Sequence, residues 1–192
     1  MIESLEQLLS ESKEFISSSR LSEISGIPAH TIRKDVGFLS HVKSRSTGYN
    51  IKDLKSVIIK DFDLSRERNI CVVGLGNLGT AILNYPQFDN YKITAGFDNN
   101  INKIELLNTK IELFPAYAIE EIVKERDIEL AILTIPASAV QITVERLEKG
   151  GIKGIINFAP VSFHSSNKNF FVKNVSVLEE LKILSSSIFL KK

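Results

Sequence analysis

The segment GLGNLG, residues 74–79, has glycines at the spacing G-x-G-x-x-G, which suits a chain that closes around a pyrophosphate. Gly74 would allow a tight turn, Gly76 would let the backbone approach the phosphates, and Gly79 would let a helix pack closely on a strand. The phosphates would then face the free N–H groups at the start of the following helix. We therefore predict a cofactor-binding segment made of Gly74, Leu75, Gly76, Asn77, Leu78 and Gly79.

A carboxylate follows at the end of the next strand-like run, where YKITAGFD, residues 91–98, ends in Asp98. In dinucleotide-binding folds, a carboxylate at this place accepts hydrogen bonds from the adenosine ribose. It would also repel a 2′-phosphate, and Asn99 and Asn100 add no positive charge, so the sequence favours NAD over NADP. The alternative is a Rossmann-like core with an empty pocket or with another nucleotide.

Two later strand ends are expected at the same crevice. TIPA, residues 134–137, and NFAP, residues 157–160, each place a proline where an apolar run stops. Because ligands lie outside the carboxyl ends of parallel strands, we add Thr134, Pro136 and Asn157 to the predicted cofactor-binding residues. Thr134 or Asn157 would meet the ribose or the nicotinamide. The alternative is that both prolines only end their strands.

Positive charge is concentrated between residues 30 and 49, although the whole chain has a formal net charge of only +1. Asp35 is the one acidic residue in this stretch. Such a local cluster is typical of a surface that contacts DNA phosphates. The alternative is a solvated basic face on a helical dimerisation domain. The predicted DNA-binding residues are His30, Thr31, Arg33, Lys34, Lys43, Ser44, Arg45 and Tyr49.

The elements that must position the basic cluster are helices and turns. Apolar residues near helical spacing open the chain, at Ile2, Leu5, Leu8, Leu9, Phe15 and Ile16. SSSR, residues 17–20, offers N-cap hydroxyls for a short helix that ends at Gly26, and a third helix follows over 27–40. This arrangement is a helix-turn-helix, and the polar segment 41–50 suits a small β-wing or loop. A helix over 51–62 completes a first domain, residues 1–64.

The elements that must position the glycine motif alternate between strands and helices from Asn69 onwards. This alternation predicts an α/β domain over residues 65–175, with a parallel sheet and helices on both faces. A terminal helix within residues 176–192 has one apolar face, which must be buried on its own domain or on a partner subunit. The face consists of Val177, Leu178, Leu181, Leu184 and Ile188.

Composition narrows the function further. The single cysteine, Cys71, cannot form an internal disulfide, which fits a reducing compartment. No apolar run is as long as the roughly 18 residues of a membrane span, and the polar N-terminus is unlike a signal peptide, so we predict a cytoplasmic protein without a membrane partner.

The sequence also disfavours a dehydrogenase. No cluster of residues has metal-ligand spacing, and His164, which lies in a polar loop, is a poor acid–base candidate. We therefore predict no catalytic residue.

Seven segments together resemble the Rex family of bacterial redox-sensing transcriptional repressors. They are IRKD (32–35), TGYN (47–50), VVGLGNLGTAILNYPQF (72–88), AGFD (95–98), AILTIPA (131–137), GIKGIINFAPV (151–161) and NV (174–175), and they run over nearly the whole chain.

This resemblance implies a homodimer in which each subunit has an N-terminal winged-helix domain and a Rossmann domain that binds NADH or NAD⁺. It also implies that the last helix crosses to the partner subunit, and that NADH releases the dimer from an inverted-repeat operator in double-stranded DNA. Two departures are FLSHVK, residues 38–43, in place of phenylalanine–glycine pairs, and Ser176 in place of an Asp that takes part in switching in many members. The alternatives are an NAD-dependent oxidoreductase and a nucleotide-binding regulatory module without DNA binding.

Overall fold

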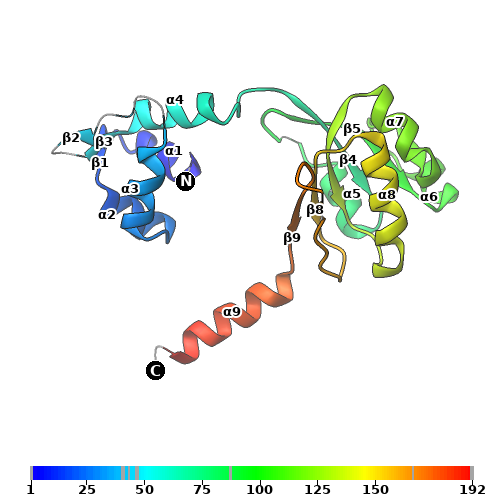
Figure 1. The fold of residues 1–192 in the computed structure, drawn as a ribbon. Helices are drawn as coiled ribbons and strands as arrows, with labels where there is room; N and C mark the ends of the chain where they lie inside the picture. The colour runs from blue at the N-terminus through cyan, green and yellow to red at the C-terminus, as the bar shows by residue number, and fades with distance from the viewer. Residues whose placement is uncertain are drawn as a thin grey trace. The chain divides into compact units, whose positions relative to one another are not determined.

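A computed structural model describes residues 2–39, 42, 44–45, 48–86, 88–165 and 167–190. The chain divides into two compact units, Met1–Arg66 and Glu67–Lys192 (Figure 1). The basic cluster lies in the N-terminal unit and the glycine motif in the C-terminal unit.

The N-terminal unit is a helix-turn-helix with a small sheet. Its described elements are α1 (Ile2–Ser10), β1 (Phe15–Ile16), α2 (Ser18–Ser25), α3 (Ala29–Gly37), β2 (Ser44–Arg45), β3 (Gly48–Asn50) and α4 (Ile51–Asp61). The strands pair antiparallel in the order β1-β3-β2, so β2 and β3 form the predicted wing. The helices share one core, to which each contributes a buried aliphatic side chain, such as Leu5, Leu21, Ile32 and Leu54.

The turns of this unit follow the capping residues predicted from the sequence. The Ser17 hydroxyl accepts a hydrogen bond from the Arg20 N–H at 3.1 Å and so caps the start of α2. Gly26 ends α2 in the left-handed region, with φ of 71°, and its N–H donates to the Ser22 carbonyl at 2.9 Å. These two caps set the length of α2 and the turn that leads into α3.

The prediction that Phe15 and Ile16 belong to a helix was wrong, because these two residues form strand β1. Ser12 has φ of 59°, which lies outside the helical region and follows the end of α1. Ile16 then pairs with Tyr49 on β3 and is buried. Gly48 permits this pairing, since a Cβ there would lie 2.2 Å from the Ile16 carbonyl oxygen. A strand of two residues has no periodicity of its own, so the sequence pattern did not distinguish it.

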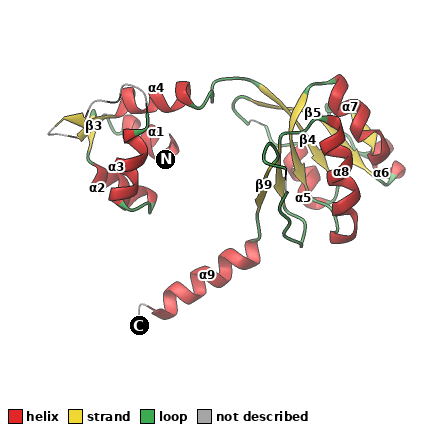
Figure 2. Ribbon diagram, in the orientation of Figure 1, coloured by secondary structure: helices red, strands yellow, loops and turns green. Residues whose placement is uncertain are grey.

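The C-terminal unit is built on a six-stranded parallel sheet, which confirms the predicted Rossmann-like fold (Figure 2). The strand order is β6-β5-β4-β7-β8-β9, the order of a doubly wound dinucleotide-binding sheet. The chain order reverses between the two central strands, β4 and β7. The strands are β4 (Arg68–Val73), β5 (Tyr91–Asp98), β6 (Leu113–Pro115), β7 (Ile128–Leu133), β8 (Gly154–Asn157) and β9 (Phe171–Asn174).

Helices cover the two faces of this sheet through separate cores. On β4, Cys71 and Val73 pack in the core that also holds buried residues of α7 (Ile119–Glu125) and α8 (Val140–Gly150). Ile70 and Val72 point to the opposite core, which includes Leu83 of α5 (Asn77–Leu83). Burial raises the pKa of the Cys71 thiol, as expected for a small structural hydrophobe.

Three shorter elements follow the carboxyl ends of the strands. They are α6 (Ile101–Leu106), after β5, and two single 3₁₀ turns, η1 (Ala116–Ala118) and η2 (Ala137–Ala139), which precede α7 and α8. These elements begin one to four residues after a strand, so their first residues lie close to the carboxyl ends of the sheet.

The last helix, α9 (Val177–Leu190), differs from the other described helices because every one of its residues is exposed. The Ser176 hydroxyl accepts a hydrogen bond from the Glu179 N–H at 3.3 Å at its start. Among the described residues, no helix is long and apolar enough to cross a membrane. The exposed large apolar side chains of α9 are Val177, Leu178, Leu181, Ile183, Leu184, Ile188, Phe189 and Leu190.

Candidate nucleotide and nucleic-acid sites

A pocket of about 530 Å³ lies where β4, β5 and β7 end, at the point where the strand order reverses. This is the place at which open α/β sheets bind their ligands. The pocket is lined by Val73, Gly74, Gly76, Asp98, Asn99, Lys103, Ala116, Thr134, Ile135, Pro136, Ser138, Ala139 and Thr143.

The glycine turn, which begins at Gly74 after β4, is held in place by Thr134, the residue directly after the neighbouring strand β7. Gly74 has φ of 94°, and its carbonyl accepts a hydrogen bond from the Thr134 hydroxyl at 2.6 Å. A Cβ at Gly79 would lie 1.8 Å from that same Gly74 carbonyl oxygen. Gly74 and Gly79 are therefore required by the fold itself, and the Thr134 hydroxyl is already used to hold the turn.

Gly76 differs from the other two glycines of the motif. Its φ is −74°, an ordinary value, and no described heavy atom other than its chain neighbours lies within 4 Å of the position that a Cβ would take. Internal packing therefore does not require a glycine here. Gly76 lines the pocket directly before α5, so a side chain at this position would occupy space that a phosphate could use.

Asp98 is held at the pocket by the backbone. One carboxylate oxygen accepts a hydrogen bond from the Leu75 N–H at 2.7 Å, and the other accepts one from the Asn100 N–H at 2.8 Å. The Lys103 ammonium lies 3.7 Å from the first of these oxygens. The carboxylate is therefore fixed at the end of β5 and ties that strand to the glycine turn.

The predicted cofactor-binding residues fall into two groups. Gly74, Gly76, Asp98, Thr134 and Pro136 line the pocket. Outside its lining, Leu75 supplies its N–H to Asp98, Gly79 packs behind the turn, and Asn77 and Leu78 begin α5.

Asn157, which was predicted to face the pocket, is not among the residues that line it. It is 1 % exposed, and its amide group is fully engaged. The Nδ2 group donates to the Val161 carbonyl at 2.7 Å and to Asn174 Oδ1 at 2.8 Å, while Oδ1 accepts from the Ala159 N–H at 3.0 Å. These bonds fix the loop after β8 to the end of β9, which is a structural use of the amide.

Four polar lining residues were not among those predicted from the sequence: Asn99 directly after β5, Lys103 on α6, Ser138 on η2 and Thr143 on α8. Lys103 follows Asp98 by five residues and lies on the next helix, a spacing that could have drawn attention to it. Ser138 and Thr143 lie beyond TIPA on a segment with no motif of its own.

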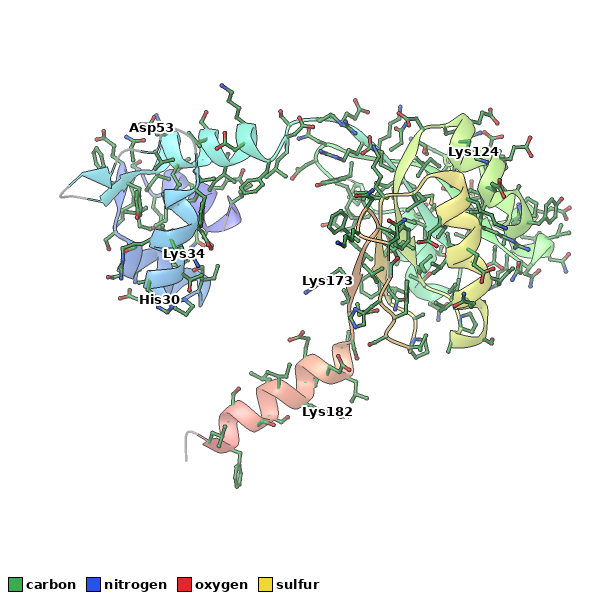
Figure 3. All side chains as sticks on the ribbon, in the orientation of Figure 1. His30, Lys34, Asp53, Lys124, Lys173 and Lys182 are labelled. Carbon is green, nitrogen blue, oxygen red and sulfur yellow. The ribbon has the colours of Figure 1, made fainter. Side chains whose placement is uncertain are left out.

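The N-terminal unit presents part of the predicted DNA-binding set on α3. His30, Arg33 and Lys34 are exposed, and Thr31 is half-buried. His30 and Lys34 both lie on this helix in Figure 3. The Arg33 guanidinium donates a hydrogen bond to the Ser18 hydroxyl at 2.9 Å, which connects α3 to the start of α2.

The remaining predicted DNA contacts belong to the wing. The backbones of Ser44 and Arg45 form β2, which pairs with β3, and Lys43 lies outside the described residues. Tyr49 is only 7 % exposed and belongs to the core of the unit. This placement supports a packing role for Tyr49 and does not support the predicted DNA contact.

The part of the chain that the structure describes contains no group of three or more His, Cys, Asp or Glu residues that could hold a metal ion. Its charged pocket residues are Asp98 and Lys103. The pocket thus offers backbone donors, small residues and one ion pair, which is chemistry for binding a ligand.

Comparison with known proteins matches this geometry. Residues 65–161 match the family described as CoA binding domain. The redox-sensing transcriptional repressor Rex of Clostridioides difficile is 37 % identical over 94 % of this chain and 87 % of its own length. The protein of the same name from Listeria welshimeri is 35 % identical over 94 % of this chain and 84 % of its own.

A solved structure covers both units. The Rex-family repressor RSP has a TM-score of 0.86 and 30 % sequence identity, over 99 % of this chain and 89 % of its own. RSP has also been solved with β-NAD⁺ and operator DNA, with a TM-score of 0.85, and with β-NADH, with a TM-score of 0.83. The likeness therefore extends through the helix-turn-helix, the parallel sheet and the terminal helix.

Proposed function

Because the chain belongs to the Rex family of redox-sensing transcriptional repressors, we propose that it binds an operator through its N-terminal unit and leaves that DNA when NADH occupies its C-terminal pocket. The relatives are named as repressors and not as enzymes, which sets the oxidoreductase alternative aside. The match of both units to a repressor likewise sets aside a regulatory module without DNA binding.

The observation that carries the cofactor assignment is the open space at Gly76 in a pocket at the sheet's reversal point. A pyrophosphate would lie against the glycine turn and the first N–H groups of α5. Asp98, already fixed by two backbone donors, would accept hydrogen bonds from the adenosine ribose. Thr134 would act indirectly, by holding Gly74 in place.

The DNA assignment rests on the exposed side chains of α3. In a helix-turn-helix, the second helix enters the major groove, so His30, Thr31, Arg33 and Lys34 would face base edges and phosphates. Lys43, Ser44 and Arg45 would extend this contact from the wing. We place the protein in the cytoplasm, where a bacterial operator is reached.

The terminal helix supports a homodimer. The fold leaves α9 without a buried residue, and it also leaves an apolar groove of about 490 Å³ beside β9. Ile156, Phe171 and Lys173 line this groove on the sheet face that carries α5. Lys173 is labelled on β9 in Figure 3. A second copy would cover both apolar surfaces, and a two-fold dimer would match an inverted repeat in the operator.

Cofactor and DNA would be linked through two states of this dimer. NADH shifts DNA affinity only by binding one state better than the other, and DNA must alter NADH affinity by the same factor. Ser176 keeps the cap of α9 but carries no charge. The switch in this chain would therefore work without an acidic side chain at that position.

The test is a DNA-binding titration of the purified protein on the RSP operator duplex, with NADH, NAD⁺, coenzyme A or no ligand. Selective loss of binding with NADH is the expected result. Binding that ignores NADH and NAD⁺ but responds to coenzyme A would replace the assigned ligand. If the duplex is not bound, selection from random DNA sequences follows, and failure there would remove the repressor function.

A further inference from the structure

We propose that Lys103 sets the selectivity of the pocket between dinucleotides with and without a 2′-phosphate, by acting as a ligand for that phosphate. This inference rests on the proposed function, because it assumes that the adenosine ribose binds at Asp98. It adds a cationic group to a site in which the sequence reading found only a repelling carboxylate.

The first support is the charge balance at the end of β5. Among the described residues that line the pocket, Asp98 carries the negative charge and Lys103 the positive one. Their charged groups lie 3.7 Å apart. A 2′-phosphate would therefore meet a neutral pair and not a lone carboxylate, and an ammonium group is a common phosphate ligand.

The second support is that Asp98 does not need Lys103 to hold its place. Two backbone N–H groups, from Leu75 and Asn100, already bind both carboxylate oxygens. The Asp98 side chain is 12 % exposed, whereas that of Lys103 is 47 % exposed. Because the ammonium is about half exposed and lies 3.7 Å from the carboxylate oxygen, it can turn toward a bound phosphate while the backbone donors keep Asp98 in place.

The third support is the position of Lys103 within its element. It is the third residue of α6, which starts directly after Asn100, and Asn100 caps that helix by accepting from the Lys103 N–H at 3.4 Å. The cap holds the backbone of Lys103 beside the ribose end of the pocket. Only the long side chain needs to move for the ammonium to leave Asp98.

The experiment is isothermal titration calorimetry of the full-length protein with NADH and with NADPH. Lys103→Gln should lower NADPH affinity about tenfold, the value of one charge-assisted hydrogen bond, and NADH affinity less than about threefold. Asp98→Asn should raise NADPH affinity about tenfold, and the double variant should lose that gain. Lys124→Gln, on α7 and outside the pocket, is the matched control and should change neither affinity (Figure 3).

Three results would overturn the proposal. Equal losses for NADH and NADPH in Lys103→Gln would show that the lysine only positions Asp98. An unchanged NADPH affinity in Lys103→Gln would show that the ammonium does not reach the phosphate, while normal NADH binding would leave the proposed function intact. An unmodified protein that binds neither nucleotide would remove the proposed function and this inference together.

Discussion

Gly74, Gly76 and Gly79 belong to one motif, yet their surroundings give them different tasks. Gly74 adopts a left-handed conformation, and Gly79 touches the Gly74 carbonyl, so both serve the turn. Gly76 has ordinary dihedral angles and free space at its Cβ position, so a glycine here keeps room for a ligand in the pocket. Substitution at these positions should therefore separate folding from ligand binding.

We expect Gly76→Asp to keep the free energy of unfolding of the protein and to lose NADH binding, because the new carboxylate would occupy the phosphate position and repel the phosphate. Gly79→Ala should instead lower the free energy of unfolding by about 1–3 kcal/mol, the usual cost of overpacking. Calorimetric titration and urea unfolding of the two variants measure both quantities. A Gly76→Asp variant that still binds NADH would contradict the site assignment.

Asp98, Lys103 and Asn157 show how far the place of a single residue can be predicted from the sequence. Asp98 was predictable because the end of the second strand of a dinucleotide fold has a known use. Lys103 was not predicted, because its five-residue separation from Asp98 becomes informative only once the start of α6 is known. Asn157 does not line the pocket, because its amide is bound to Val161 in the loop after β8 and to Asn174 at the end of β9.

At the scale of elements, α3 is positioned by short-range signals. Ser17 and Gly26 cap α2, and Ile32 and Val36 bury one face of α3 in the core. The opposite face is left with the basic side chains Arg33 and Lys34. The local sequence therefore determines which side of the helix is available to DNA.

We expect Arg33→Ala combined with Lys34→Ala to weaken operator binding about tenfold or more and to reduce the salt dependence of binding by about one to two ion contacts. NADH affinity should not change, since both residues lie in the other unit. Fluorescence anisotropy with labelled operator at several salt concentrations measures this, with Lys124→Ala as the control. Unchanged affinity would remove both residues from the DNA interface.

Apart from the short helix α6, which was also not predicted, the elements that the sequence did not determine are those made by long-range pairing. The wing strands were expected only as a wing or loop, and β1 was expected as part of a helix. Ile16 becomes a strand residue because Tyr49 pairs with it from more than thirty positions away. In contrast, the strands and helices after Asn69 are long enough to show their own alternation, and that prediction was confirmed.

At the scale of the whole molecule, the apolar face of α9 and the groove beside β9 are two surfaces that one copy of the chain leaves exposed. The helix follows the strand directly, so a dimer formed through α9 would be connected to the same sheet edge that Asn157 and Asn174 hold together. In the proposed dimer, this connection would give the pocket-bearing sheet a mechanical route to the partner subunit.

We expect Leu181→Lys combined with Leu184→Lys to convert the proposed dimer to monomer, because two charges would have to be buried in an apolar contact. Each C-terminal unit should keep its own fold, since no residue of α9 contributes to its cores. Analytical ultracentrifugation and NADH titration test the two parts. A variant that sediments like the unmodified protein would show that α9 is not the interface.

Because α9 is exposed in a single chain, the cellular concentration of the protein would affect how strongly it represses. If the helix is covered only when two chains meet, the stability it contributes follows mass action, and the melting temperature rises with protein concentration. A cell that makes few copies would hold a larger share of single chains, which have one DNA-reading unit for two half-sites. Copy number would then set how much repression a given nucleotide balance produces.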